Sequence, residues 1–184
     1  AHARADLEQR GVHMLLNRQV AEVHRDALVL RDGTRMAVDL VVWAAGIRGP
    51  EVLEEMDGLE IGRQRQLLVR RTLQTTVDDD IFALGDCASC QAGSEGRPVP
   101  PRAQAAHQQA ALLADSLRLR LRGEPLPAFS YRERGNLITL GRDRAVGSVS
   151  AAGHDSPPFS GPAARLGYWL LVRRHLWVLL GPVR

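Results

Sequence analysis

The chain has 184 residues, of which 45% are hydrophobic and 24% charged, and its formal net charge is +3. This length allows one domain with a substantial core or two small ones. All 24 basic residues are arginines spread along the chain, which argues against nucleic-acid binding, and the two cysteines exclude a disulfide framework and favour a reducing compartment. The sequence contains no signal-peptide pattern, no run of roughly 18 apolar residues that would span a membrane, and no expected metal site.

The N-terminal quarter predicts a helix, a hairpin and a buried strand. Ala1–Arg10 is alanine-rich and charged, which is typical of the end of a helix that stops at Gly11. Because this helix is already under way at residue 1, we expect the chain to begin within a fold. Asp32-Gly33 lies between two strand-like runs and predicts a hairpin. Val41–Ala45 is continuously apolar, as expected of a strand covered on both faces, and Gly46 ends it.

The middle of the chain predicts two strands and a long helix. Leu67–Thr72 is expected to be a strand, and Ile81–Leu84 a short buried strand that leads directly into Gly85-Asp86. The stretch Gln91–Pro101 is rich in Gly, Pro and Ser and predicts a loop. A helix should follow over Arg102–Arg122, which contains neither Gly nor Pro.

The C-terminal part predicts short strands followed by an apolar helix. The strands should lie between Phe129 and Val149, and the helix should cover Ala163–Leu180 after a loop with Pro157-Pro158.

The Gly85-Asp86 pair is a candidate ligand-binding turn. Glycine lets a ligand approach the backbone closely, and the aspartate can accept a hydrogen bond from a sugar or ribitol hydroxyl. Such a charge-assisted bond is worth about 1.5–3 kcal/mol. Open α/β folds bind ligands at the carboxyl ends of parallel strands, where this turn is predicted to lie. The alternative is a plain turn in which Asp86 caps the next segment.

Two segments in this order resemble the two-dinucleotide-binding flavoproteins. "TTVDDDIFALGDCA", which ends at Ala88, closely resembles their second flavin motif, and "VVWAAG", which ends at Gly46, resembles the strand and turn that join the NAD domain back to the FAD domain. The resemblance implies that Asp86 holds the ribitol of FAD. The cofactor-binding residues that it implies are Ala45, Gly46, Gly85, Asp86, Cys87, Ala88, Ala103, Gln104 and Ala105.

A third segment, "VPPRAQAAHQQA" over Val99–Ala110, resembles the signature "PP-T-A-Q-x-A-x-Q" of type II NADH:quinone dehydrogenases. Arg102 stands where the family has threonine. The resemblance implies that Gln104 and Gln108 offer hydrogen bonds to a quinone beside the flavin, and that His107 serves in proton delivery. An exposed polar stripe and a surface histidine are the alternatives for these residues.

This resemblance implies an α/β fold class: the remainder of FAD- and NAD(P)-binding Rossmann-like domains plus a small α+β C-terminal region with an amphipathic helix. Residues 1–48 would end the NAD(P)-binding domain, residues 49–123 would form the second half of the FAD-binding domain, and residues 124–184 would form the C-terminal domain. The implied enzyme passes electrons from NADH through FAD to a membrane quinone, so its cofactors are FAD and NAD(H). It would lie peripherally on the cytoplasmic face of the bacterial inner membrane.

The sequence lacks the G-x-G-x-x-G fingerprint with which such enzymes bind each dinucleotide. We therefore expect this chain to be the C-terminal part of a longer enzyme and to be inactive alone. One alternative function is that of an FAD-dependent disulfide reductase using Cys87 and Cys90, spaced as C-x-x-C. The simpler interpretation makes Cys87 a small buried residue near the flavin and Cys90 part of a loop. A second alternative is a non-catalytic module that binds a membrane or a partner.

The segment Ala163–Arg184 is a candidate membrane-surface helix. It contains no acidic residue and combines four arginines with tryptophans and leucines, which is typical of helices that lie in the plane of the interface. The alternative is a helix that docks on its own domain or on a second copy in a homodimer.

Overall fold

The computed structural model describes residues 2–92, 98–141, 144–151 and 154–181. The chain forms two compact units, one made of Ala1–Ala44 with Gly135–Arg184 and the other of Ala45–Arg134. The three-part division at residues 48 and 123 stays a prediction.

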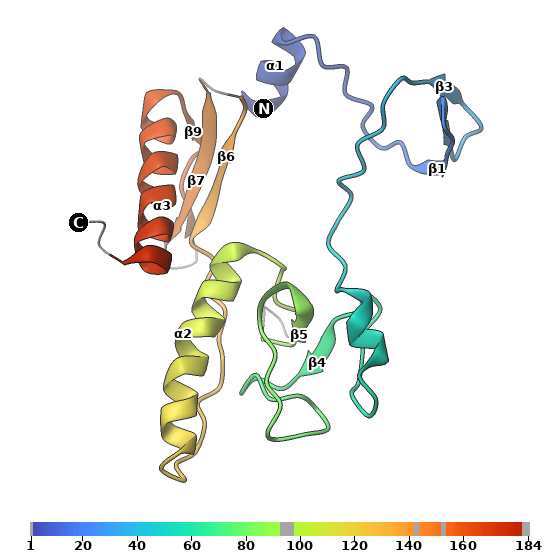
Figure 1. Ribbon diagram of the computed structural model, residues 1–184. Coiled ribbons are helices and arrows are strands. Elements are labelled where there is room, and N and C mark those ends of the chain that lie inside the picture. Colours follow the sequence, from blue (N-terminus) through green and yellow to red (C-terminus); the bar gives the residue numbers. More distant parts are fainter. Residues whose placement is uncertain (1, 93–97, 142–143, 152–153, 182–184) are drawn as a thin grey trace. The chain divides into compact units, whose positions relative to one another are not determined.

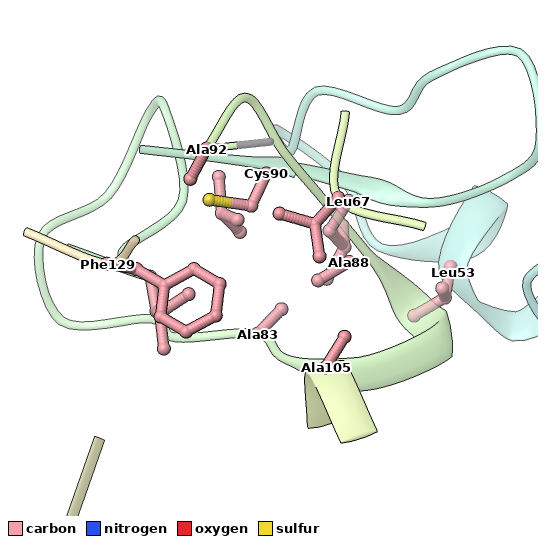
Figure 2. Close-up of a cluster of buried hydrophobic side chains, with 11 residues drawn as sticks. Leu53, Leu67, Ala83, Ala88, Cys90, Ala92, Ala105 and Phe129 are labelled. Atoms are coloured by element: carbon pink, nitrogen blue, oxygen red, sulfur yellow. The ribbon is translucent and has the colours of Figure 1, made fainter. Parts of the chain in front are cut away.

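The Ala45–Arg134 unit is built around a short parallel strand pair. Strand β4 (Leu67–Val69) pairs with β5 (Ala88–Cys90), and helix α2 (Ala103–Arg120) and the two 3-10 helices η1 (Glu51–Glu55) and η2 (Gly85–Cys87) complete its regular structure. These elements enclose one core cluster, shown in Figure 2: Leu53, Leu67, Val69, Leu73, Ala83, Ala88, Cys90, Ala92, Val99, Ala105 and Phe129.

The predicted helix is confirmed, with its ends two residues or fewer from those expected. Gly123 takes a left-handed φ of 70° after α2, and the N–H groups of Gly123 and Glu124 bond the carbonyls of Arg120 and Leu119. Glycine is favoured there because other residues resist that conformation. Of the predicted loop Gln91–Pro101, residues 93–97 lie outside the described part of the chain.

Neither predicted strand of this unit forms as expected. β4 ends at Val69 because the chain turns at Arg70, whose carbonyl accepts from the N–H of Leu73. The prediction of a strand over Ile81–Leu84 is wrong: Phe82 makes a single antiparallel bridge to Gln74, and Ile81 is exposed. One bridge leaves most backbone groups of this segment without a strand partner, although Ala83 is buried as expected.

The other unit contains the predicted N-terminal helix and hairpin. Helix α1 (His2–Gln9) ends before Gly11, and strands β1 (Val20–Val23), β2 (Ala27–Leu30) and β3 (Arg35–Ala37) form an antiparallel sheet in that order. The turn between β2 and β3 contains Gly33 at a left-handed φ of 84°, and the N–H of Thr34 donates to the Asp32 carboxylate over 3.0 Å. The Asp-Gly hairpin signal is confirmed.

The C-terminal elements of this unit form a sheet covered by a helix. Strands β6 (Gly135–Thr139) and β7 (Ala145–Ala151) pair with each other, and β7 also pairs with β8 (His154–Asp155) and β9 (Phe159–Ser160). Helix α3 (Pro162–Leu180) packs along β6, β7 and β9 (Figure 1). The strands and helix expected after Phe129 are thus confirmed.

The predicted strand Val41–Ala45 is wrong. This segment has no regular secondary structure, and the side chains of Val42 and Trp43 are 79% and 64% exposed. An apolar run becomes a buried strand only where neighbouring strands pair with its backbone, and none of the described strands does so.

Candidate functional site

The Gly85-Asp86 turn forms η2, between extended Leu84 and strand β5. Gly85 has a left-handed φ of 70°, and a Cβ atom at this position would meet the Cβ of Ala106 at 3.5 Å. Glycine is therefore required by backbone conformation more than by space. The turn was expected to follow the carboxyl end of a strand over Ile81–Leu84. Because this segment is not a strand, that expectation is wrong, and the turn lies instead directly before the parallel strand β5.

The backbone of the turn is bound tightly, whereas its carboxylate is not. The Gly85 N–H donates to Gln109 Oε1 at 2.7 Å, and the Asp86 carbonyl accepts from Gln66 Nε2 at 2.9 Å. The Asp86 side chain is exposed and has no hydrogen-bond or ion-pair partner among the described residues. A free carboxylate on a fixed backbone is the kind of acceptor that a ribitol hydroxyl requires, so this turn fits the expected flavin.

Cys87 completes the turn. It is half-buried, and its thiol lies 3.1 Å from the Leu84 carbonyl oxygen, to which it donates. The thiol therefore packs against the turn's own backbone.

The other predicted cofactor-binding residues have differing surroundings. Ala88 and Ala105 are 5% and 3% exposed, and their side chains belong to the core cluster, whereas Ala103 is exposed at the start of α2. Ala45 and Gly46 are also exposed, with Gly46 at a φ of 110°. Within the described structure, no hydrogen bond links Ala45 or Gly46 to the Gly85-Asp86 turn.

The carboxamides of Gln104 and Gln108 hold the segment that follows the core. Gln108 bonds both backbone groups of Arg132, accepting from its N–H at 3.1 Å and donating to its carbonyl at 2.9 Å. The Gln104 oxygen accepts from the Arg134 N–H at 3.1 Å. Both side chains thus fix residues 132–134 along α2. His107 lies between them in sequence and is exposed.

Arg102, the departure from the family signature, belongs to a polar cluster at the start of α2. The Glu133 carboxylate accepts from Arg102 Nη1 at 2.8 Å, from the Tyr131 hydroxyl at 3.1 Å and from the Gln104 amide. Burial, followed by the contact with Glu133, raises the pKa of Tyr131 to about 12, so this hydroxyl stays protonated at neutral pH and donates. Glu133 therefore connects the Arg102 side chain to the predicted quinone-facing glutamine.

The two thiols are not equivalent. Cys90 is 0% exposed, it lies in β5, and Figure 2 shows its sulfur among the buried apolar side chains. Burial raises the pKa of the Cys90 thiol, which disfavours the reactive thiolate. The expectation that Cys90 belongs to a loop is wrong. Its place in the core also argues against an exchangeable Cys87–Cys90 dithiol.

Sequence reasoning missed Gln66 and Gln109, the residues that bind the turn. Gln109 is 2% exposed, four residues after buried Ala105 and seven before buried Ser116. This spacing is the inward face of a helix, which would have identified Gln109 as a buried amide. Gln66 directly precedes β4, and no sequence signal marks it.

A second candidate surface is the outer side of α3. Its sheet-facing side contains buried Ala164 and also Gly167, which lies against Leu137. The opposite side carries large apolar side chains that are 51% to 61% exposed, with Arg173 stacked 4.6 Å from the Trp169 ring centre: Leu166, Trp169, Leu170 and Trp177. Leu171 and Val178, at helical spacing on the side of Ala164, are also 53% and 61% exposed, so exposed apolar side chains lie all around the helix and it is less one-sided than predicted.

No helix among the described residues is long and apolar enough to cross a membrane. Residues 182–184 of the predicted membrane-surface segment lie outside the described part of the chain.

Comparison with known proteins assigns this arrangement to a family. Residues 1–110 match the pyridine nucleotide-disulphide oxidoreductases. The chain belongs to this family. The predicted membership of a family of oxidoreductases and the Rossmann-like α/β fold are therefore confirmed.

Comparison with individual relatives identifies a narrower group of enzymes that this chain resembles. The chain is 41% identical over 180 residues to the type II NADH:quinone oxidoreductase of Haemophilus influenzae, a match that covers 97% of this chain and 40% of that protein. The predicted resemblance to type II NADH:quinone dehydrogenases is thus confirmed, for a chain that spans about two fifths of this relative's length.

Solved structures agree on the fold. The sulfide:quinone oxidoreductase of Aquifex aeolicus superposes with a TM-score of 0.70 at 16% identity, covering 96% of this chain and 44% of that one. The NDH2 of Plasmodium falciparum, solved in complex with RYL-552, superposes with a TM-score of 0.70 at 14% identity, covering 94% of this chain and 50% of that one.

Proposed function

We propose that this chain is the C-terminal part of an FAD-dependent enzyme that passes electrons from NADH to a membrane quinone. The observation that carries the proposal is the 41% identity to a type II NADH:quinone oxidoreductase over 97% of the chain. In such an enzyme the bound flavin supplies the redox chemistry, accepting a hydride from NADH and delivering two electrons to a quinone. The chain's own residues bind, orient and shield the cofactor.

Asp86 is the residue to which we assign the ribitol of FAD. Its carboxylate is exposed and has no hydrogen-bond or ion-pair partner among the described residues, and the backbone of the turn is bound by two side chains. Ala45, Gly46, Cys87, Ala88, Ala103 and Ala105 would line the cofactor through backbone groups or close packing. The chain lacks the G-x-G-x-x-G fingerprint that binds the pyrophosphate, so the isolated 184 residues should bind FAD poorly and transfer no electrons.

The start of α2 is the part of this chain that we assign to the quinone. Gln104 and Gln108 lie four residues apart, on one side of the helix. Their amides hold residues 132–134, so a quinone would meet a surface that these glutamines and the Glu133 cluster build together. His107, exposed beside them, would deliver protons to the reduced quinone.

The outer side of α3 is the surface that we assign to the membrane. Four exposed apolar side chains with Arg173 among them match helices that lie in the lipid interface, and arginine is attracted to an anionic leaflet. Among the described residues, α3 packs on the sheet of its unit and still leaves these large apolar side chains exposed, as a helix that binds a lipid surface would. We place the enzyme on the cytoplasmic face of the bacterial inner membrane, where NADH and quinone meet.

The decisive experiment uses Asp86→Ala in the enzyme that contains this chain. Loss of the acceptor removes about 1.5–3 kcal/mol, so FAD should bind roughly 10- to 150-fold more weakly. Flavin content by absorbance and NADH-driven quinone reduction measure the effect. Asp57→Ala, at another exposed carboxylate of the same unit, is the matched control and should retain FAD. A full flavin complement in Asp86→Ala, or an unsubstituted enzyme purified without FAD, would contradict the proposal.

A further inference from the structure

Two buried glutamines bind the two ends of the Gly85-Asp86 turn. Gln109, on α2, is 2% exposed, and Gln66, just before β4, is 8% exposed. Gln109 accepts from the Gly85 N–H at 2.7 Å, and Gln66 donates to the Asp86 carbonyl at 2.9 Å. The first backbone donor and the last backbone acceptor of this two-residue turn are therefore both bound by side chains.

Burying an amide is costly unless its hydrogen bonds are made. A leucine or methionine would fill either position without that cost. The amide of each glutamine is therefore explained by its hydrogen bond to the turn. Gln109 fixes the Gly85 N–H, and Gln66 fixes the Asp86 carbonyl. The bond to the Gly85 N–H fixes the peptide group before the left-handed Gly85, and the bond to the Asp86 carbonyl fixes the peptide group after Asp86, so the backbone that carries the Asp86 side chain is held at both ends.

The fixed backbone contrasts with the free carboxylate that it carries. Asp86 is exposed and its carboxylate makes no hydrogen bond to the described residues, so none of them orients it in that way. Its orientation must come from the backbone, which Gln66 and Gln109 hold.

We propose that Gln66 and Gln109 are positioning residues that act through Asp86 and set the affinity for FAD. This inference rests on the proposed function, in which Asp86 accepts a ribitol hydroxyl. Neither glutamine needs to touch the cofactor.

The two glutamines have opposite hydrogen-bonding roles, which a pure packing function would not have. Gln109 acts as an acceptor, so glutamate in its place still accepts from the Gly85 N–H. Gln66 acts as a donor, so glutamate there faces the Asp86 carbonyl with a second acceptor. Methionine, of similar length, removes the hydrogen bond at either position.

The experiment compares FAD dissociation constants of the enzyme that contains this chain, titrated by flavin fluorescence after FAD removal. Gln109→Met should weaken binding about fivefold or more, and Gln109→Glu should stay within about threefold of the unsubstituted enzyme. At position 66 the order reverses, with Gln66→Glu at least as weak as Gln66→Met. Gln64→Met, at an exposed glutamine of the same unit, is the matched control and should bind normally.

A double-substitution cycle tests whether the glutamines act through Asp86. In an Asp86→Ala background, Gln109→Met should weaken FAD binding by less than about twofold, because the carboxylate that it orients is gone. If Gln109→Met fails to fold, Gln66→Met in the same background gives the same test.

Equal FAD affinities of the methionine and glutamate variants at both positions would overturn the inference. So would an undiminished effect in the Asp86→Ala background. Both results would leave the proposed function standing, since FAD is still bound. An enzyme that takes up no FAD under any condition overturns the proposed function, and the inference with it.

Discussion

Helices α2 and α3 are almost equal in length, with 18 and 19 residues, yet they use their side chains in opposite ways. α2 buries a glutamine and a serine along with Ala105, and its apolar content is modest. α3 is the more apolar sequence, but Ala164 is the only buried residue among its described side chains. The more apolar helix is thus the less buried one.

The difference shows that the burial of a helix depends on which elements pack against it as much as on its own amino-acid composition. α2 lies against a core cluster and against the backbone of η2, so even a polar amide gains a partner there. α3 packs on a small sheet, which buries Ala164 and leaves large apolar side chains exposed along the helix. Its outer apolar side therefore remains exposed and available to a lipid surface, which is how we assign it.

The largest expected effect comes from making the outer side of α3 polar. Trp169→Gln with Trp177→Gln should lower binding to phosphatidylglycerol-containing vesicles about 100-fold, since each exposed ring contributes roughly 1.4 kcal/mol of apolar burial. The stability of the fold should change little. Flotation of the enzyme with vesicles measures binding, and Leu121→Gln, at an exposed leucine just after α2, is the control. Unchanged flotation of the double variant would show that α3 has a purely structural function.

The next effect concerns the buried side of α2 and the stability of the fold. Ala105→Leu should destabilise the fold by about 1–3 kcal/mol, because a larger side chain must enter the packed core between α2 and β5. Ala103→Leu, two residues earlier but exposed, should change the free energy of unfolding by less than about 0.5 kcal/mol. Urea unfolding compares the two. Equal costs would mean that α2 does not pack on the core as described.

The smallest effect concerns the polar surface of α2. Gln108→Leu removes two hydrogen bonds to Arg132 and should raise the apparent KM for quinone more than that for NADH. The cost in stability should be about 0.5–1.5 kcal/mol, since the bonds are exposed to solvent. Steady-state kinetics with each substrate varied in turn measures the ratio. An equal rise in both KM values would restrict Gln108 to holding residues 132–134.

Local signals predicted much of the fold. The Asp32-Gly33 hairpin, the helix that Gly123 ends and the helix after Pro157-Pro158 all depend on residues close in sequence, and all are confirmed. The strands expected at Val41–Ala45 and Ile81–Leu84 depended on pairing with distant segments, which apolar sequence alone does not specify.

The same limit applies to the site. The Gly85-Asp86 turn was identified because its residue types follow each other directly. Gln109 was missed because its partner, the Gly85 N–H, lies 24 residues away. Cys90 was assigned to a loop because the strand Ala88–Cys90 has only three residues. So short a segment gives no recognisable alternating pattern beside a Gly- and Ser-rich loop.

One long-range contact also constrains how the Ala45–Arg134 unit is made. Phe129, 2% exposed in the core, donates its N–H to the Arg71 carbonyl at 2.7 Å and accepts from the Arg71 side chain at 3.1 Å. These bonds join residues 58 positions apart, almost at the end of the unit. During synthesis, the core therefore lacks this side chain and both bonds to Arg71 until Phe129 has left the ribosome. Nascent chains stalled before and after its emergence should differ in protease resistance, whereas the turn at Asp86, which Gln66 and Gln109 bind, needs only the earlier residues.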